Sequence, residues 1–351
     1  MSEQAIQIRP FRPEDRQAWS QYVLGHPMGT VFHRLEWSDA VAAAYGHQAM
    51  HLTAWAGDRL AGVLPLFLVN SPFVGKVLVS VPYATYGGVL ADGPEAGIAL
   101  YNHARELMNQ RHGRYLEFRH RESSSLDLPE ISRYDTFRKI LPAKPEEVLP
   151  GLPRKARAAA RSGLSALGEN CTQAGSELDL INQVYDLYCI TLRRLGSPNY
   201  SRRLFHELRR TYGEDCVALV VCDAGKPIAG VISFIFRDEI VPYFSGSLDE
   251  GMRKNANNVM YTRLMEYAVG RGLKWFDFNR TRRDNVGPYD FKRHHGFEPS
   301  PLHYQIALAD GVAMPNLTPS NRKFVLAGRV WKKLPLSVTR LAGAVVSRWI
   351  P

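Results

Sequence analysis

The side chains best suited to chemistry lie in residues 272–297, GLKWFDFNRTRRDNVGPYDFKRHHGF. Asp277 stands inside an aromatic run, which predicts a strand buried on both faces. Asn279 and Arg280 follow directly, with further arginines after them. Hydrogen-bonding side chains therefore gather at the carboxyl end of a strand, where open α/β sheets bind ligands. The alternative is a core strand followed by a solvated basic loop.

Lys292 is the strongest single candidate for catalysis. It follows the turn signal Gly287-Pro288 and the aromatic Tyr289, and it precedes a second stop at Gly296. A cation beside a strand end can stabilise the oxyanion of an acyl-transfer intermediate or hold a donor phosphate. We predict one of these two roles for Lys292.

Two further groups have a chemical and a structural interpretation. Asp277 either titrates abnormally or is satisfied by a hydrogen bond. Tyr243, on the predicted preceding strand, has the chemistry to protonate a leaving group, although packing explains it as well. We expect His294 and His295 to be exposed to solvent.

Two sets of residues are candidates for binding substrate. Arg154, Lys155, Arg157 and Arg161 form an acid-free cluster, and a helix would place its three arginines on one face. Such a face suits a diphosphate, although a solvated surface helix has the same pattern. The second set, Tyr83, Tyr86 and Gly87, either lines a pocket or forms a tight turn between strands.

Composition narrows the class of protein. The chain has 351 residues and a formal net charge of +10, which indicates two domains and an anionic partner. Its start lacks the apolar segment of a signal peptide, and no apolar run is long enough to cross a membrane. The four cysteines form no CxxC pair, so we expect a cytoplasmic protein with reduced thiols and no metal.

A weak internal repeat predicts the architecture. The segments 55–67 and 222–235 both read as a strand, a polar turn and a strand that opens with Ala-Gly-Val. After each we expect another strand (81–88 and 241–247), a helix and a final strand. The fold class is therefore α/β with tandem lobes, each a mixed sheet flanked by helices. We predict lobes at 1–145 and 146–314 and a basic C-terminal helical tail at 315–351.

With these motifs in view, the chain resembles the Fem family of peptidoglycan aminoacyl-transferases, which carry two GNAT-type acyltransferase lobes. It is most similar to the FemAB-like subgroup associated with exosortase/PEP-CTERM and exopolysaccharide systems. The resemblance covers nearly the whole chain, and its most specific motif is Tyr289-Asp290-Phe291-Lys292 followed by Gly296-Phe297. Other matching segments are FHRLEW (32–37), LAGVLPL (60–66), PYATYGG (82–88), LPRKAR (152–157), SGS (245–247), NNVMY (257–261) and FDFN (276–279).

The resemblance implies transfer of an acyl or aminoacyl group from acyl-CoA or aminoacyl-tRNA to an amine of a cell-envelope or exopolysaccharide precursor. It places donor binding at Arg253, Lys254 and Asn258, where GNAT lobes hold a pyrophosphate at a helix N-terminus. The glycines of the usual turn are missing here. We see no heptad pattern for a tRNA-binding helical arm. The rival interpretation is a non-catalytic, degenerate transferase that binds an anionic glycolipid or RNA.

The tail has its own pattern. Seven cations and no acid lie between residues 322 and 351, and apolar residues that include Trp331 and Trp349 alternate with them. This pattern predicts either a helix lying on an anionic membrane surface or a helix docked on the body with a solvated basic face.

Overall fold

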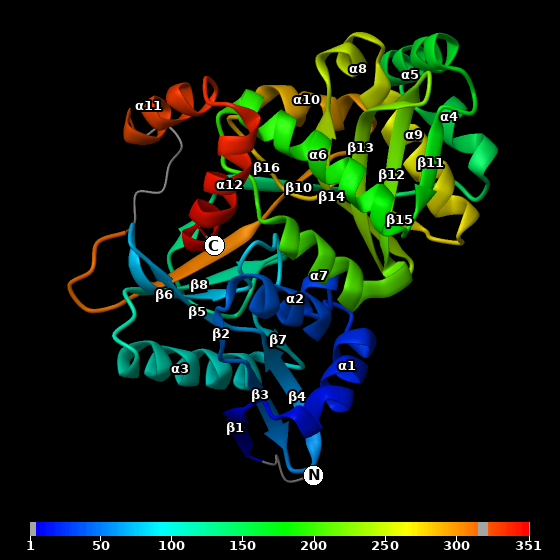
Figure 1. Ribbon diagram of the computed structural model, residues 1–351. Helices are drawn as coiled ribbons and strands as arrows, with labels where there is room; N and C mark the ends of the chain where they lie inside the picture. Colours follow the sequence, from blue (N-terminus) through cyan, green and yellow to red (C-terminus); the bar gives the residue numbers. More distant parts are fainter. Residues whose placement is uncertain (1–4, 315–321, 351) are drawn as a thin grey trace. The chain divides into compact units, whose positions relative to one another are not determined.

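The computed structural model describes residues 5–314 and 322–350, with side chains described from residue 326 onward in the second range (Figure 1). The chain divides into two compact units. Unit 1 contains the described residues up to Arg133 together with 301–314 and 348–350, and unit 2 contains 134–300 and 322–347. This division differs from the predicted lobe boundary at 145/146, because the chain segment that starts at Tyr134 joins the sheet of unit 2. The predicted boundary at 314/315 borders residues outside the described ranges.

Unit 1 has two sheets, with strand orders β1-β3-β4-β7 and β2-β5-β6-β8-β18-β9 among the described residues. Its strands are β1 (Ile6–Pro10), β2 (Gln48–Ala49), β3 (Leu52–Ala56), β4 (Arg59–Leu64), β5 (Phe67–Ser71), β6 (Gly75–Ser80), β7 (Leu90–Ala91), β8 (Tyr115–His120), β9 (Glu130–Ile131) and β18 (His303–Leu308). Its α-helices are α1 (Arg16–Gly25), α2 (Leu35–Tyr45) and α3 (Pro94–Gln110). Leu100, Ala104 and Met108 of α3 pack into an apolar core with strands of both sheets.

Unit 2 is built on one sheet with the order β11-β12-β13-β14-β15-β10-β16, and β17 pairs with β10. The strands are β10 (Tyr134–Ile140), β11 (Thr172–Gly175), β12 (Cys216–Asp223), β13 (Lys226–Phe236), β14 (Glu239–Ser247), β15 (Trp275–Asp277), β16 (Thr281–Arg282) and β17 (Pro299–Pro301). The α-helices are α4 (Val148–Gly151), α5 (Arg154–Leu167), α6 (Leu178–Leu195), α7 (Arg202–Tyr212), α8 (Asp249–Arg253), α9 (Ala256–Gly270), α10 (Val286–His294), α11 (Arg322–Trp331) and α12 (Leu336–Val346).

Helices cover the sheet of unit 2, and its central strands are apolar on both faces as a result (Figure 1). Helix α6 approaches β14 so closely that a methyl group at Gly246 would overlap the backbone of Leu187. Helix α9 packs its Val259, Leu264 and Ala268 into a core cluster with β12, β13 and α5. Gly246 is therefore required by close approach of helix and strand.

The predicted fold class is confirmed, and so are the two hairpins, which are the antiparallel pairs β3–β4 and β12–β13. Each unit also contains a parallel strand pair joined by a helix, β6–α3–β8 and β14–α9–β15. The strand predicted at 81–88 is wrong, because this segment is irregular. Its main chain leaves the sheet at Ser80, and Tyr83 takes a left-handed conformation with φ of 60°.

Candidate active site

The parallel pair β14–β15 in unit 2 separates soon after it begins. The strands pair at Glu239–Trp275 and Ile240–Phe276, and β15 ends at Asp277 while β14 continues to Ser247. Among the described strands, residues 241–247 of β14 therefore pair only with β13. An open strand edge presents N–H and C=O groups that an extended ligand can bind by main-chain hydrogen bonds.

The end of β15 is fixed by the side chain of Asp277, which is fully buried. Its Oδ1 accepts hydrogen bonds from Thr136 Oγ1 (3.0 Å) and from the main-chain N–H of Asn279 (2.7 Å). Asn279 itself has φ of 65°, and its Oδ1 accepts a bond from the Arg280 N–H (2.8 Å). Of the two predicted interpretations of Asp277, the structure shows the hydrogen-bonded one. The predicted strand ends two residues before Asn279, because the chain turns there.

Lys292 holds the same turn from the other side. Its Nζ donates to the carbonyl oxygens of Phe278 and Asn279, both at 2.7 Å, and to that of Arg280 at 3.4 Å. Burial lowers the pKa of this amine to about 7, and the negative charge of Asp277 opposes the shift. An ammonium has three hydrogens, and each has a main-chain acceptor here. The structure therefore places Lys292 as a support of the strand-end turn.

The motif around Lys292 is helical. Residues 286–294 form α10, so Gly287-Pro288 lies in the first turn of a helix, and its interpretation as a chain turn is wrong. Pro288 is tolerated because the N–H groups of a first turn have no partner within the helix. His295, predicted to be exposed, is buried, and its Nδ1 is bonded to Phe291 O (2.7 Å). His294 is exposed.

Asp135 on β10 is a site residue that sequence reasoning missed. This buried carboxylate accepts hydrogen bonds from Tyr289 Oη (2.7 Å) and from Arg283 Nε (2.9 Å). Asp135 raises the pKa of Arg283, and burial raises the pKa of Tyr289, with Asp135 adding to that shift. Tyr289 is thus bound to a strand about 150 residues away in the sequence, and no local signal marks Asp135.

The predicted donor turn lies before α9, which begins at Ala256 with Asn255 as its N-cap. Lys254 forms an ion pair with Asp223. Arg253 is exposed and lines an open pocket of about 580 Å³. Asn258 Nδ2 lies 3.5 Å from His295 Nε2, which connects α9 with the end of α10. The three predicted donor-binding residues thus lie at the end of α8, in the turn after it and in the first turn of α9, and they have different neighbours.

That open pocket is strongly charged, with two acids among several cations. Arg194 pairs with Asp249, and Lys226 pairs with Glu250 at 2.8 Å. The residues that line the pocket are Ile190, Arg193, Arg194, Lys226, Leu248, Asp249, Glu250, Arg253 and Lys332.

The basic cluster 154–157 begins α5. Arg154 and Lys155 are exposed, and Arg157 is half-buried with its Nη1 bonded to Pro150 O at 2.7 Å. The opposite face of α5 packs on α9, where a methyl group at Gly163 would lie 3.1 Å from Lys254 O. The predicted helix is confirmed, and its phosphate contact stays a prediction.

Tyr243 lies on the open part of β14 and is half-buried. Its ring contacts Phe244 edge-on at 4.7 Å between centroids, and that of Phe234 at 6.2 Å. Tyr243 therefore has a packing role, and its position on the open part of β14 is also compatible with the predicted role as a proton donor to a leaving group.

Unit 1 has a pocket of about 260 Å³ at the N-terminus of α3 and the end of β8. Of the predicted residues Tyr83, Tyr86 and Gly87, Tyr86 lines this pocket, together with Gly88 and Arg121. Tyr83 lies elsewhere, with its hydroxyl bonded to His47 Nε2 (2.6 Å) and Arg348 O (3.1 Å). Gly87 has φ of 120°, which a residue with a side chain rarely adopts.

His120 is the notable polar group of this pocket. It is 7% exposed, and its Nε2 accepts a hydrogen bond from the Val89 N–H at 3.0 Å. The neutral ring therefore carries its proton on Nδ1, which has no partner among the described residues. Burial lowers the pKa of His120 to about 4, so the ring is neutral at pH 7. A buried N–H donor without an acceptor is costly unless a ligand or water supplies one.

Residues 152–293 match the family model described as an acetyltransferase (GNAT) domain. This range contains the open pair β14–β15, the turn before α9 and α10 except for its last residue, His294. The chain has a tandem GNAT-like fold. No curated protein matches the sequence.

Several solved structures share this fold across most of the chain. FemX is 14% identical with a TM-score of 0.65, and the match covers 87% of this chain and 98% of FemX. A tandem GNAT protein from the clavulanic acid biosynthesis pathway is 12% identical with a TM-score of 0.53, covering 87% and 98%. The C-terminal domain of a putative lysylphosphatidylglycerol synthetase from Agrobacterium fabrum is 11% identical with a TM-score of 0.54, covering 84% and 91%.

Within residues 5–314 and 322–350, no three His, Cys, Asp or Glu side chains are grouped to hold a metal ion. No helix in the described part of the chain combines the length and apolar content that a membrane crossing requires.

Proposed function

We propose that this protein is an acyltransferase that moves an acyl or aminoacyl group from an activated donor, an acyl-CoA or an aminoacyl-tRNA, to an amine. The observation that carries the proposal is the open parallel pair β14–β15 inside the range that matches the GNAT model. The free edge of β14 at 241–247 suits an extended donor arm such as that of a thioester.

The reaction needs positioning more than covalent help. The amine nitrogen attacks the carbonyl carbon, a C–N bond forms, and the C–S or C–O bond to the carrier breaks. The leaving sulfur or oxygen takes a proton, for which Tyr243 is our candidate donor, and the proton that the attacking nitrogen loses restores the Tyr243 hydroxyl. Holding the two reactants in line accounts for a large part of the acceleration in such reactions.

The strand-end turn is the part of the site that must stay rigid. Lys292 and Asp277 bind the main chain of residues 278–280 from two sides. In our proposal Asn279 and Arg280 contact substrate from this turn, and Lys292 adds positive charge where the oxyanion develops. Tyr289 anchors α10 to β10 through Asp135.

We assign the anionic parts of the substrates to the cations outside this turn. Arg253 and Lys254 hold a donor phosphate, supported by the N-terminus of α9. Arg154, Lys155 and Arg157 bind the diphosphate of a nucleotide- or lipid-linked acceptor. The unit 1 pocket that Tyr86 lines binds an acceptor oxygen through the Nδ1–H of His120, which has no acceptor among the described residues.

The acceptor class belongs to the same proposal. A cell-envelope or exopolysaccharide precursor, and membership of the exosortase/PEP-CTERM-associated subgroup, rest on the sequence motifs. The proposed setting is the cytoplasm, where both donors are made.

The test is amine-dependent release of free thiol from acetyl-CoA and longer acyl-CoAs, and of free tRNA from aminoacyl-tRNA, over a panel of amino-sugar acceptors. Each donor is also tested for thermal stabilisation, which reaches about 2.7 kcal/mol at a hundred times its Kd. We expect one donor class to stabilise the protein and to react. Tyr243→Phe should keep that stabilisation and react more slowly.

Two outcomes would contradict the proposal. Stabilisation by a donor without amine-dependent release would contradict transfer to these amines. No stabilisation by a donor would favour the rival, a non-catalytic degenerate transferase that binds an anionic glycolipid or RNA. That rival has one structural observation in its support: α5 packs against the turn before α9 that would hold a donor phosphate. No stabilisation and no release with either donor class would exclude acyl transfer from these donors.

A further inference from the structure

The two C-terminal helices of unit 2 attach to its body through glycines. A methyl group on Gly328 of α11 would lie 3.1 Å from Gly196 O, directly after α6. A methyl group on Gly343 of α12 would overlap the side chain of Asn199. Both helices therefore use small residues where they approach the connection between α6 and α7.

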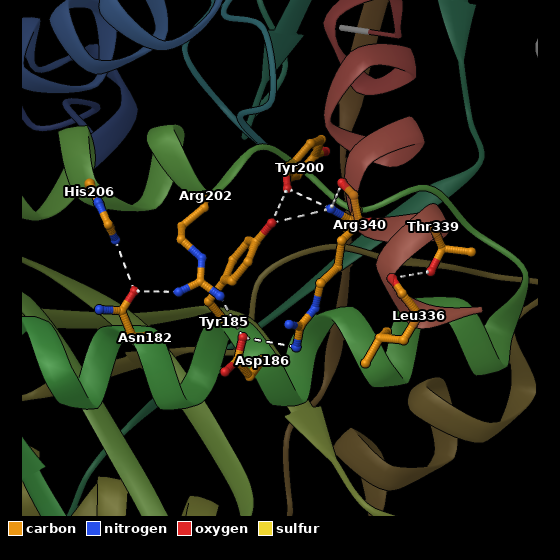
Figure 2. Close-up of polar contacts among 10 residues, drawn as sticks. Asn182, Tyr185, Asp186, Tyr200, Arg202, His206, Leu336, Thr339 and Arg340 are labelled. Carbon is orange, nitrogen blue, oxygen red and sulfur yellow. Dashed lines mark hydrogen bonds and ion pairs between the residues drawn. The ribbon is translucent and has the colours of Figure 1, made fainter. Parts of the chain in front are cut away.

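Polar contacts complete the attachment of α12 (Figure 2). Asn199 Nδ2 donates to Arg340 O at 3.2 Å, and the Arg340 guanidinium pairs with Asp186 on α6 at 2.9 Å. Arg202 binds the same carboxylate oxygen at 2.7 Å. The predicted docked helix is thus what the structure shows for α12. Docking by itself assigns no function to the opposite face of α12.

The outward faces of the two helices are apolar. Residues two positions away on a helix lie about 200° apart, so Leu326 and Val330 face away from Gly328, and Leu341 and Val345 face away from Gly343. Their exposed fractions are 63%, 55%, 75% and 55% in that order. Val338, three residues before Leu341, is 44% exposed. A docked helix normally turns its large apolar residues toward the protein body, whereas these five residues point toward solvent.

We call these five residues the outer stripe: Leu326, Val330, Val338, Leu341 and Val345. The stripe belongs to a strongly basic segment, since residues 322–351 contain seven cations and no acid. Arg329, Lys332 and Lys333 are exposed next to it in the sequence. The side chains of Arg322, Lys323, Phe324 and Val325 lie outside the described residues.

We infer that the outer stripe binds the surface of an anionic lipid bilayer. An apolar helix face with flanking cations and no acids matches a surface of acyl chains covered by negative headgroups. A protein partner would need complementary acids at several positions, whereas a bilayer supplies negative charge everywhere. With 11 residues, α12 is too short to cross a bilayer, so the helices lie in the interface. This inference is independent of the proposed acyl transfer.

The test is sedimentation of the full-length protein with vesicles of phosphatidylglycerol and phosphatidylcholine, compared with phosphatidylcholine alone. We expect binding to the anionic vesicles that weakens as salt is raised. The double variant Leu341→Asp/Val345→Asp should bind at least about tenfold more weakly, because it removes apolar burial and adds repulsion. Lys333→Gln should weaken binding about fivefold.

The control is Leu178→Asp, which introduces one of the two negative charges of the double variant at a 47% exposed leucine at the opposite end of α6. It should bind like the wild type, and unchanged melting temperatures would show that all variants fold. The inference is wrong if the wild type ignores anionic vesicles at low salt, or if the double variant still binds as the control does. Loss of a dimer in the double variant, without vesicle binding by the wild type, would instead assign the stripe to a second copy of the chain.

Discussion

Replacing Lys292 by Met removes the ammonium that holds the strand-end turn and keeps the length of the side chain. The carbonyl oxygens of Phe278 and Asn279 then lose their acceptor bonds to Nζ. Each buried carbonyl without a donor costs about 1–3 kcal/mol. The wild type, however, carries a cost of its own, since burial disfavours the charged form of Lys292.

The size of that cost follows from the pKa. Lys292 has a pKa of about 7 in the folded protein, against an ordinary value of 10.5. Between these two pH values the unfolded chain binds up to one proton more than the folded protein. The stability of the wild type therefore rises with pH by at most about 1.4 kcal/mol per unit, or about 5 kcal/mol over the interval. Below pH 7 both states are protonated, and this term is constant.

Lys292→Met lacks this term, so the loss of unfolding free energy that it causes should be smallest near pH 7 and grow toward pH 10. Urea unfolding of both proteins at several pH values, followed by tryptophan fluorescence, measures the difference. Lys76→Met is the control, because Lys76 is exposed in the folded protein and its loss should leave the pH dependence of stability unchanged. If the destabilisation by Lys292→Met does not change with pH, the lowered pKa of the buried Lys292 amine is refuted.

Measurements of turnover distinguish a catalytic role of Lys292 from ground-state binding of a donor phosphate. If the strand-end turn must be held for transfer, Lys292→Met lowers kcat by roughly a hundredfold or more with little change in donor affinity. Lys292→Arg should rescue only part, because a planar guanidinium does not replace a compact ammonium between these carbonyls. A rise in donor KM with unchanged kcat would indicate ground-state phosphate binding. If a folded Lys292→Met variant has kcat and donor KM values near those of the wild type, a catalytic role of Lys292 is excluded.

Three further predictions concern other parts of the chain. Gly246→Ala should destabilise the protein by several kcal/mol, since the methyl group meets the main chain of α6; a melting temperature within a degree or two of wild type would contradict this. Asp135→Asn should lower the pKa of Tyr289, measured by NMR of labelled tyrosine, because the carboxylate helps to raise it. His120→Phe should weaken acceptor binding while donor stabilisation stays unchanged, and equal losses of both would contradict a role confined to the unit 1 pocket.

The sequence was sufficient for elements whose signals are local. Each hairpin is marked by a polar turn between two apolar runs, and both were placed correctly. The helix α9 after β14 was expected as well, and its N-cap is Asn255, with φ of 55°. Local preferences for turns and caps decide such features, and they are visible in one short window.

What failed depends on distant residues. The segment 81–88 has the composition of a strand but leaves the sheet after Ser80, and β8 pairs instead with β6 and with β18 from near residue 305. Asp135 was invisible as a site residue because its partners Tyr289 and Arg283 follow about 150 positions later. Spacing along the chain carries no information about such pairs.

The two parallel pairs show why the repeat does not make the two units equivalent. In unit 1, β6 and β8 pair at four successive positions, from Val77–Tyr115 to Ser80–Phe118, and β18 occupies the other edge of β8. In unit 2 the corresponding pair has two positions, after which β15 ends in a turn held by Asp277 and Lys292. A strand edge that stays paired has no main-chain groups left for a ligand, whereas one that opens early has several. The buried groups that hold the turn are therefore what keeps the edge of β14 open, and this is the physical reason to place donor binding in unit 2.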